Sequence, residues 1–342
     1  MPTMTSRPTI SREWRLIRRP RGAFVASDLD LVETQVPSPR PGEVVVANTH
    51  LSVDPYMRGR MDDAPSYIPP FPLGSALDGG AVGIVVESRS TALAQGDVVE
   101  HFLGMREAVV ADAGAFVPLD LAGRAPEVYL GTLGATGLTA WLATSAMAPI
   151  RDGDTVVVTG AAGAVGGLAG QLARLRGAGR VIGSAGSATK RALLIEELGY
   201  DDAFDYHDGS AEELLAKAAP GGIDVLVDSV GGAQLEAAID QMATGGRIAL
   251  VGMASEYDGR TPHPFTNLYS LVRRRVSVQG FLVSDHLDRL AEFRREVGAW
   301  LDEGAVLHRE TVVLGIEALP DTLHAVLSSG STLTGKAVLS LA

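Results

Sequence analysis

The sequence predicts an α/β protein: a doubly wound parallel sheet joined to a second domain built mainly from short strands. From about residue 126, apolar strands alternate with helical segments, and this alternation produces a parallel sheet covered by helices. Before residue 125, short β-rich runs are separated by Gly, Pro and Asp turns, which is typical of a barrel or sandwich. With 342 residues, the chain is long enough for two domains with separate cores.

In the first 125 residues, strand patterns occupy Glu43–Asn48, Ala81–Glu87 and Gly96–Val99. The polar residues Met1–Ile10 precede them and are expected to form a loose end. The tail, Thr311–Ala342, returns to a strand, a helix and a strand, and we expect it to close onto the first domain.

The central region repeats strand and helix. Strand patterns occupy Thr155–Thr159, Arg180–Gly183, Asp224–Asp228, Arg247–Val251 and Val276–Phe281. Helical patterns occupy Val165–Leu175, Lys190–Leu198, Gln234–Met242 and His286–Glu303.

Charge and composition exclude several classes of function. There are 29 Lys and Arg against 41 Asp and Glu, a net charge of −12, so the chain lacks the basic surface that nucleic acid or anionic lipid requires. It has no cysteine, which excludes disulfides, thiol nucleophiles and metal sites with a Cys ligand. The N-terminus lacks the apolar segment of a signal peptide, and no apolar run approaches about 18 residues. We therefore expect a cytoplasmic protein with no nucleic-acid or membrane partner.

A glycine-rich turn, Thr159–Gly167, is the strongest local motif, because it follows a buried strand and opens a helix. Gly163 would allow the backbone to approach a pyrophosphate, and Gly166 would allow the helix to pack closely on the sheet. Ala161 replaces the first glycine of the dinucleotide fingerprint. The alternative is a tight turn that only packs the helix.

The next strand end indicates which nicotinamide cofactor would bind. An NAD enzyme usually carries Asp or Glu there for the ribose hydroxyl. The segment Gly183–Arg191 has no carboxylate, but it has hydroxyls and the cations Lys190 and Arg191, which suit the 2′-phosphate of NADP. The alternative is that both cations are solvated at the start of a helix.

Six motifs together carry a resemblance to a known family: Ser52–Met61 (with VDPYMR), Gly131–Ala140, Ala161–Gly166, Asp228–Gly232, Gly252–Tyr257 and Gly335-Lys336. With them the chain resembles the zinc-free branch of the medium-chain dehydrogenase/reductase superfamily that contains alkenal, prostaglandin and curcumin reductases. The resemblance implies a GroES-like, β-barrel-type catalytic domain (1–125 with 311–342) and an NADP-binding Rossmann domain (126–310). It also implies a homodimer formed through the nucleotide domain.

The resemblance implies NADP(H) as the cofactor and assigns residues to it. The pyrophosphate falls on Gly163, Ala164, Val165 and Gly166, and the 2′-phosphate region on Ser187, Lys190 and Tyr206. The nicotinamide half falls on Val251, Gly252, Met253, Ala254, Ser255, Tyr257, Phe281, Leu282 and Val283. Ser229 and Leu333 stand where relatives usually have asparagines that contact the cofactor.

No metal is expected. Leu73–Gly80 lacks the Gly-His-Glu of the zinc-dependent members, and the seven histidines show no metal-ligand spacing.

The implied reaction is reduction of the C=C bond of a small α,β-unsaturated aldehyde or ketone by hydride transfer to the β-carbon. Tyr257 and Tyr56 are the candidate catalytic donors, since phenols with a pKa of about 10 are protonated at neutral pH. Either could instead be a wall residue whose hydroxyl meets a backbone carbonyl. Two further functions stay open: an NADPH:quinone reductase, and a non-catalytic NADPH-binding module.

Overall fold

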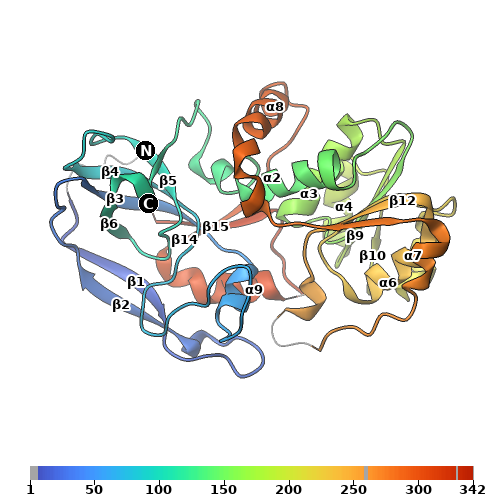
Figure 1. Ribbon diagram of the computed structural model, residues 1–342, viewed down its shortest axis with the longest axis horizontal. Helices are drawn as coiled ribbons and strands as arrows, with labels where there is room; N and C mark the ends of the chain where they lie inside the picture. Colours follow the sequence, from blue (N-terminus) through green and yellow to red (C-terminus); the bar gives the residue numbers. More distant parts are fainter. Residues whose placement is uncertain (1–6, 258–260, 329, 342) are drawn as a thin grey trace. The chain divides into compact units, whose positions relative to one another are not determined.

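The computed structural model describes residues 7–257, 261–328 and 330–341, and the chain forms two compact units (Figure 1). The first contains Met1–Leu130, Glu310–Ser331 and Lys336–Ala342, and the second contains Gly131–Arg309 and Thr332–Gly335. The second unit is a doubly wound parallel sheet and the first is mainly β-structure, so the predicted α/β class is confirmed. Of the expected loose end, residues 1–6 lie outside the described residues, and Ile10 already begins a strand.

Six parallel strands form the sheet of the second unit, in the order β10-β9-β8-β11-β12-β13. Their bounds are β8 Thr155–Val158, β9 Arg180–Ala185, β10 Asp202–Asp205, β11 Ile223–Asp228, β12 Met242–Leu250 and β13 Ser277–Gly280. The order reverses between β8 and β11, and in such sheets ligands bind outside the carboxyl ends of the strands at this reversal.

Helices cover both faces of this sheet: α2 Ala135–Leu142, α3 Ala164–Leu175, α4 Ala188–Glu196, α5 Ala211–Ala218, α6 Gly232–Gln241, α7 Tyr269–Arg274 and α8 Leu290–Asp302. A π-helical turn, Ala143–Met147, continues α2. Helices α2 and α3 pack together on one face, and α6 and α7 lie on the other (Figure 1). On the α6 face, Val157, Leu226 and Ile248 of the strands form a buried core with Leu235 and Ile239.

Two predicted boundaries in this unit were wrong. The helix expected from His286 begins at Leu290, because Val283–Arg289 is a 3-10 segment in which His286 has non-helical angles (φ −129°, ψ 22°). The strand expected from Arg247 begins at Met242, directly where α6 ends.

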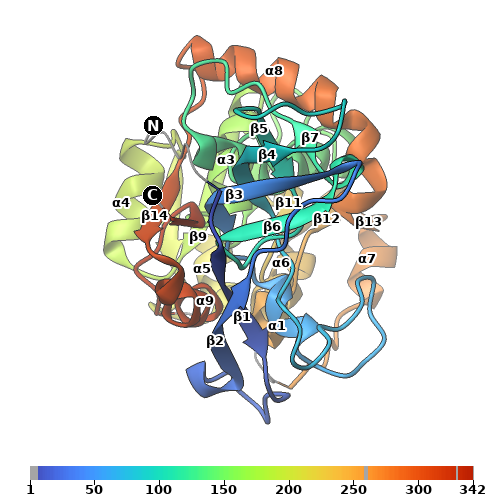
Figure 2. The same ribbon diagram turned by 90° about the vertical axis from the view of Figure 1, so that its left-hand side faces the viewer.

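The first unit holds the other strands: β1 Ile10–Leu16, β2 Leu29–Gln35, β3 Glu43–Ser52, β4 Ala81–Ser88, β5 Val98–His101, β6 Ala108–Asp112, β7 Val117–Pro118, β14 Glu310–Leu314 and β15 Lys336–Ser340. Its helices are α1 Tyr56–Arg60 and α9 Leu319–Leu327, with 3-10 turns at Ala26–Asp28, Ala113–Ala115, Pro126–Tyr129 and Ile316–Ala318. The main sheet runs β14-β15-β3-β4-β5-β7, and the long strand β3 also pairs with β6 (Figure 2). The β15–β3 pairing is antiparallel, so the chain's last strand completes a sheet begun near its start.

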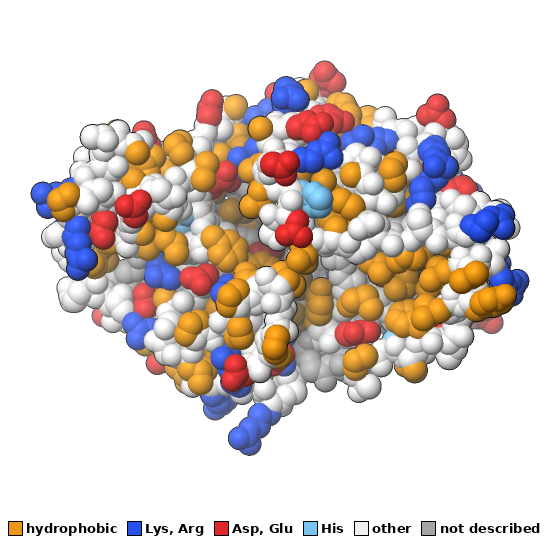
Figure 3. Space-filling view, viewed as in Figure 1, with side chains coloured by type: hydrophobic (Ala, Val, Ile, Leu, Met, Phe, Trp, Pro, Cys, Tyr) orange, Lys and Arg blue, Asp and Glu red, His pale blue; other side chains and the backbone are white. Residues whose placement is uncertain are grey.

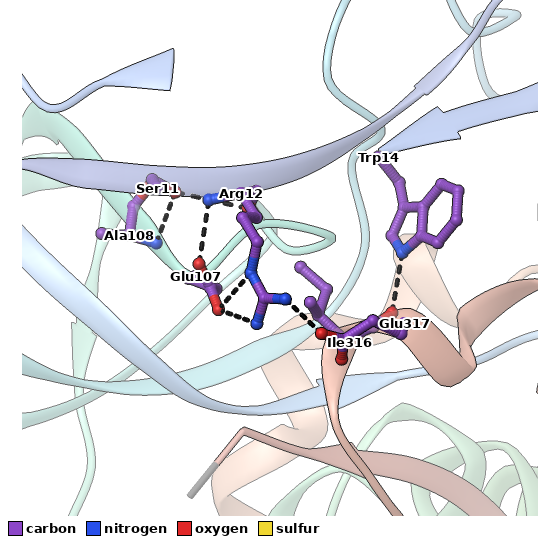
Figure 4. A network of polar contacts seen from close by, with 7 residues as sticks. All are labelled: Ser11, Arg12, Trp14, Glu107, Ala108, Ile316 and Glu317. Atoms are coloured by element: carbon purple, nitrogen blue, oxygen red, sulfur yellow. Dashed lines mark hydrogen bonds and ion pairs between the residues drawn. The ribbon is translucent and has the colours of Figure 1, made fainter. Parts of the chain in front are cut away.

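Side chains of β1 tie it to the C-terminal part of the same unit (Figure 4). The Trp14 indole N–H donates to the carbonyl of Ile316 at 2.7 Å. The Arg12 guanidinium pairs with Glu107 at 2.6 Å and also with Glu317. These contacts join three segments that are far apart in the sequence.

Within the described ranges, no helix has both the length and the apolar character that a membrane crossing requires.

Candidate active site

The glycine-rich turn connects β8 to α3 at the carboxyl edge of the parallel sheet. Gly163 is the N-cap of α3 in an extended conformation, and no side chain caps the helix there. A Cβ atom at Gly166 would lie 2.6 Å from the Cα of Ala161 and from the carbonyl oxygen of Gly160. The first turn of α3 therefore packs directly against the backbone of the glycine-rich turn. Its first N–H groups have no intrahelical partner, which suits an anion.

Ala161, the departure from the dinucleotide fingerprint, is accommodated by a second glycine. Ala161 is fully buried, and its N–H donates to the backbone carbonyl of Ser184 on the neighbouring strand at 3.0 Å. A Cβ atom at Gly183 would lie 3.0 Å from the Ala161 methyl group. The missing side chain at Gly183 thus provides the room that the extra methyl group occupies.

The expected 2′-phosphate residues follow β9 and β10, two neighbouring parallel strands. The Ser187 hydroxyl caps α4 by accepting from the Lys190 N–H at 3.2 Å. The Tyr206 hydroxyl lies close to Gly186, where a Cβ atom would be 2.7 Å from it. Lys190 is half-buried, and desolvation lowers the pKa of its ammonium group. Arg191 is instead held by β10, since its Nε donates to the Ala203 carbonyl at 2.8 Å.

The turn after β11 is organised by a buried carboxylate that the sequence reasoning did not assign to the site. Asp228 is fully buried, and its carboxylate accepts from the Thr159 hydroxyl at 2.5 Å and from the Gly231 N–H at 2.9 Å. Burial raises the pKa of Asp228, although these hydrogen bonds favour its ionised form. Its carbonyl accepts the Val251 N–H at 2.8 Å. Asp228 thereby joins the loops that follow β8, β11 and β12. The signal in the sequence that could have identified Asp228 is a carboxylate at the end of an apolar strand.

The loop after β12 folds back over the β11 turn. The Ala254 N–H donates to the Ser229 carbonyl at 3.1 Å, and the Ser255 N–H donates to the Val230 carbonyl at 2.9 Å. The side-chain hydroxyls of Ser229 and Ser255 are buried and have no hydrogen-bond partner among the described residues. Two buried hydroxyls without hydrogen-bond partners on neighbouring loops at the carboxyl edge of the sheet are rare in a native protein, and they indicate the place of a polar ligand.

Tyr257 closes the same loop. Its hydroxyl accepts from the Met253 N–H at 3.3 Å, and a Cβ atom at Gly252 would lie 2.9 Å from that oxygen. Burial raises the pKa of the Tyr257 phenol, so the hydroxyl keeps its proton at neutral pH. The phenol proton is not used by the Met253 contact, in which the oxygen only accepts.

Two further predicted segments belong to the second unit. Phe281, Leu282 and Val283 come directly after the carboxyl end of β13, and Phe281 makes an edge-on contact with His286. Leu333 lies in the segment Thr332–Gly335, whose Gly335 N–H donates to the Ala162 carbonyl of the glycine-rich turn at 2.8 Å. All the predicted cofactor residues therefore lie in one unit, on the loops and helix starts at its carboxyl edge or on the segment bound to the glycine-rich turn.

Tyr56 belongs to the first unit, where it is the first residue of α1. Its ring stacks on Phe102 with centroids 6.2 Å apart. Its hydroxyl is buried without a hydrogen-bond partner in the described ranges. Burial and the nearby Asp54 raise the pKa of the Tyr56 phenol. The arginines that follow it form ion pairs, Arg58 with Asp62 at 2.8 Å and Arg60 with Asp78 at 3.4 Å.

Over the described residues, no group of three or more His, Asp or Glu side chains is placed to hold a metal ion.

Comparisons with known proteins show the family of the chain. Residues 12–119 match the family described as the N-terminal domain of oxidoreductase, and residues 164–301 match the family described as zinc-binding dehydrogenase. The NADPH-dependent curcumin reductase of Escherichia coli (strain K12) is 36% identical over 338 residues, 97% of each chain. The chain belongs to the medium-chain dehydrogenase/reductase family. It is accordingly an oxidoreductase.

Two other relatives cover most of the chain. The 2-alkenal reductase (NADP(+)-dependent) of Nicotiana tabacum is 35% identical over 289 residues, 84% of each chain. CurA from Vibrio vulnificus, solved in complex with NADPH, is 34% identical with a TM-score of 0.90, covering 97% of this chain and 99% of that one. These relatives fall within the double-bond reductase branch that the sequence motifs indicated.

Proposed function

We propose that the protein uses NADPH to reduce the C=C bond of α,β-unsaturated aldehydes or ketones. One observation carries the proposal: the protonated Tyr257 hydroxyl lies against Gly252 and Met253, on a loop at the carboxyl edge of the sheet. This edge also carries the glycine-rich turn and the two unpartnered serine hydroxyls. A dinucleotide lying along the edge would thus have a proton donor near its nicotinamide end.

The residues of the second unit fit NADP(H). The uncapped start of α3 suits the pyrophosphate, and Lys190 with Tyr206 and Ser187 suits the 2′-phosphate. Ser229 and Ser255 would gain the partners that they lack. Favourable local contacts of this kind are needed, because a polyanionic cofactor must bind to a chain with a net charge of −12.

NADPH, when bound, supplies a hydride, and the protein must stabilise the charge that the substrate then develops. When the hydride adds to the β-carbon of an unsaturated ketone, its carbonyl oxygen becomes the negative oxygen of an enolate, and a proton must then reach the α-carbon to give the saturated product. A phenol that is still protonated can donate a hydrogen bond to this oxygen. We assign that role to Tyr257, and we assign Tyr56 as a second donor because its hydroxyl also lacks a partner.

The decisive experiment follows NADPH oxidation at 340 nm with 2-alkenals, benzalacetone and benzoquinone in parallel. The proposal predicts turnover of the first two, with the saturated carbonyl compound as product. Turnover of benzoquinone alone would favour the quinone reductase. Protection from thermal unfolding by NADPH without turnover of any of the three would favour a binding module.

We propose that the reaction is independent of zinc. The chain has no cysteine, and among its described residues no acidic or histidine cluster could take a metal. Activity should therefore survive dialysis against a strong chelator. A loss that added Zn²⁺ restores would contradict this proposal.

We also propose a homodimer formed through the second unit. Strand β13 is an edge strand with all four residues exposed, and it leaves backbone groups open to pairing. Tyr269 and Val272 on the adjoining α7 are 72% and 68% exposed, and Figure 3 shows apolar side chains at the surface in the region of α7. Light scattering should give twice the 35.7 kDa chain mass, and Val272→Glu should shift the mass toward the monomer. A monomeric wild-type protein would contradict the proposal.

A further inference from the structure

Lys336 is a buried lysine held inside the first unit. It is 3% exposed, and its Nζ donates to the Val53 carbonyl at 2.5 Å and to the Asp54 carboxylate at 2.7 Å. The other carboxylate oxygen of Asp54 accepts from the Ser52 hydroxyl. A buried charge is costly unless it is paired and hydrogen-bonded, and here both members of the pair have further partners. The pair fixes the turn that leads from β3 to α1.

Lysine is rare in this chain. Only three of the 29 basic residues are lysines, at positions 190, 217 and 336. Lys217 is exposed on α5, Lys190 is a proposed cofactor ligand, and Lys336 is buried. At this buried position, the chain has lysine, with its compact ammonium group and flexible stem, in place of the arginine that it uses at most basic positions.

The helix that Lys336 helps to fix is the one that begins with Tyr56. Helix α1 has five residues and no side-chain cap, so its position depends on contacts at its two ends. Arg58 and Arg60 anchor the far end through Asp62 and Asp78. The near end is held by the Asp54 carbonyl, which accepts the Met57 N–H at 3.2 Å, and by the pair of Asp54 with Lys336.

On its other side, Lys336 is joined to the second unit by one peptide bond. The chain passes from that unit into the first between Gly335 and Lys336. Gly335 has φ +64°, and a Cβ atom there would lie 1.9 Å from the Arg309 carbonyl, so only glycine fits. Its N–H is bound to Ala162 in the glycine-rich turn. Within the first unit, the backbone of Lys336 is held by β15, which pairs with β14 and β3, and its side chain holds the turn that leads to Tyr56.

We propose that Lys336 is a positioning residue for catalysis: through its buried pair with Asp54, it holds the Tyr56 hydroxyl where a substrate oxygen can receive its hydrogen bond. The proposal rests on the proposed reductase function and adds a residue to it. It also predicts that Lys336 acts only through Tyr56.

A double-mutant cycle tests this dependence. Lys336→Met in the wild-type background should lower kcat with an enone by roughly ten- to a hundredfold, since a misplaced donor can cost about a hundredfold. In the Tyr56→Phe background, the same substitution should change kcat less than about twofold. The Kd for NADPH should not change in either background. Lys217→Met, on the exposed face of α5, is the matched control and should leave all values unchanged.

A charge-free variant keeps the test valid if Lys336→Met does not fold. Asp54→Asn combined with Lys336→Met leaves no unpaired buried charge. This double variant should lower kcat in the wild-type background and change it little in the Tyr56→Phe background. An equal loss of kcat in both backgrounds would show a merely structural role and overturn the inference. An unchanged kcat in Tyr56→Phe would overturn it as well, while the Tyr257 mechanism would stand.

Hydrogen exchange gives a readout that does not require activity. In Lys336→Met, or in the charge-free variant, the amides of Val53, Asp54, Tyr56 and Met57 should exchange faster than in the wild type, whereas those of β4 should not. If the wild-type protein turned over no enone, the proposed function would fail, and exchange would still decide whether Lys336 holds this turn. Unchanged exchange at 53–57 would overturn the inference.

Discussion

We expect Lys190 to determine the preference of the protein for NADPH over NADH. Lys190→Ala should raise the KM for NADPH and leave that for NADH nearly unchanged, because only NADPH carries the 2′-phosphate. Loss of a charge-assisted hydrogen bond corresponds to roughly 1.5–3 kcal/mol, or about a ten- to a hundredfold change. Steady-state kinetics with both cofactors measure the effect.

Arg191→Ala is the control beside it. This arginine is bound to Ala203 and lies 3.9 Å from Asp208, so its loss should affect both cofactors alike. Equal changes in the two KM values for Lys190→Ala would remove Lys190 from the 2′-phosphate site.

Tyr257→Phe removes the phenol hydroxyl and keeps the aromatic ring. It should lower kcat by about a hundred- to a thousandfold, as for the loss of one donor to a developing oxyanion. Burial raises the pKa of this phenol above its ordinary value of 10.0, so the hydroxyl stays protonated, and the wild-type kcat should not fall between pH 6 and pH 9 through its ionisation. A pH profile that falls with an apparent pKa near 8 and is lost in Tyr257→Phe would contradict this assignment.

At the scale of elements, α3 depends on two adjacent glycines in different ways. A Cβ at Gly166 would lie 2.6 Å from backbone atoms, whereas one at Gly167 would be 3.5 Å from the nearest atom, a methyl of Leu198. Gly166→Ala should therefore push α3 away from its turn and weaken NADPH binding at least tenfold. Gly167→Ala should be neutral or stabilise by up to about 1 kcal/mol, because alanine favours a helix over glycine. Calorimetric titration and thermal melts measure both effects, and equal behaviour of the two variants would contradict the expected packing.

The sequence predicted the strands of the second unit better than its short helices. Val156, Val157 and Val158 are fully buried, so β8 was clear as a continuous apolar run. Helix α5 was not predicted, because it has only eight residues, although Ser210 caps it by accepting from the Glu213 N–H. Strands β1 and β2, which pair with each other, were also missed, because apolar and polar residues alternate only weakly along them. Short elements depend on tertiary contacts that a local pattern does not contain.

The candidate site was predictable where it depends on backbone shape. Gly163 and Gly166 were identifiable from their spacing after a strand, and the structure brings the other proposed cofactor residues into the same unit. The roles of Asp228 and Lys336 could not be predicted, because each depends on a partner distant in the sequence, Thr159 in one case and Asp54 in the other. Buried polar pairs of this kind become visible only when the topology is known.

At the scale of the molecule, the first unit is held together by segments from both ends of the chain. Trp14→Phe removes the hydrogen bond to the Ile316 carbonyl, which still accepts from the Leu319 N–H, so it should lower the free energy of unfolding by about 0.5–1.5 kcal/mol. Because the proposed cofactor residues lie in the other unit, we expect the Kd for NADPH to be unchanged. Urea denaturation and calorimetric titration separate the two effects, and a weakened Kd with unchanged stability would be the opposite of the expected result.

The position of β15 determines when the protein can finish folding during its synthesis. Residues 131–309 form most of one unit, and they leave the ribosome before the last strand has been made. The first 130 residues are complete earlier, but β3 receives its β15 neighbour only from Lys336–Ser340, and β14 depends on the same strand. Until Lys336–Ser340 has been made, the nascent chain thus carries an open edge at His50–Ser52 of β3, whereas β6 already pairs with Glu43–Ala47. The unit made first is therefore completed last, and until then its open strand edge can pair with other chains unless it is protected.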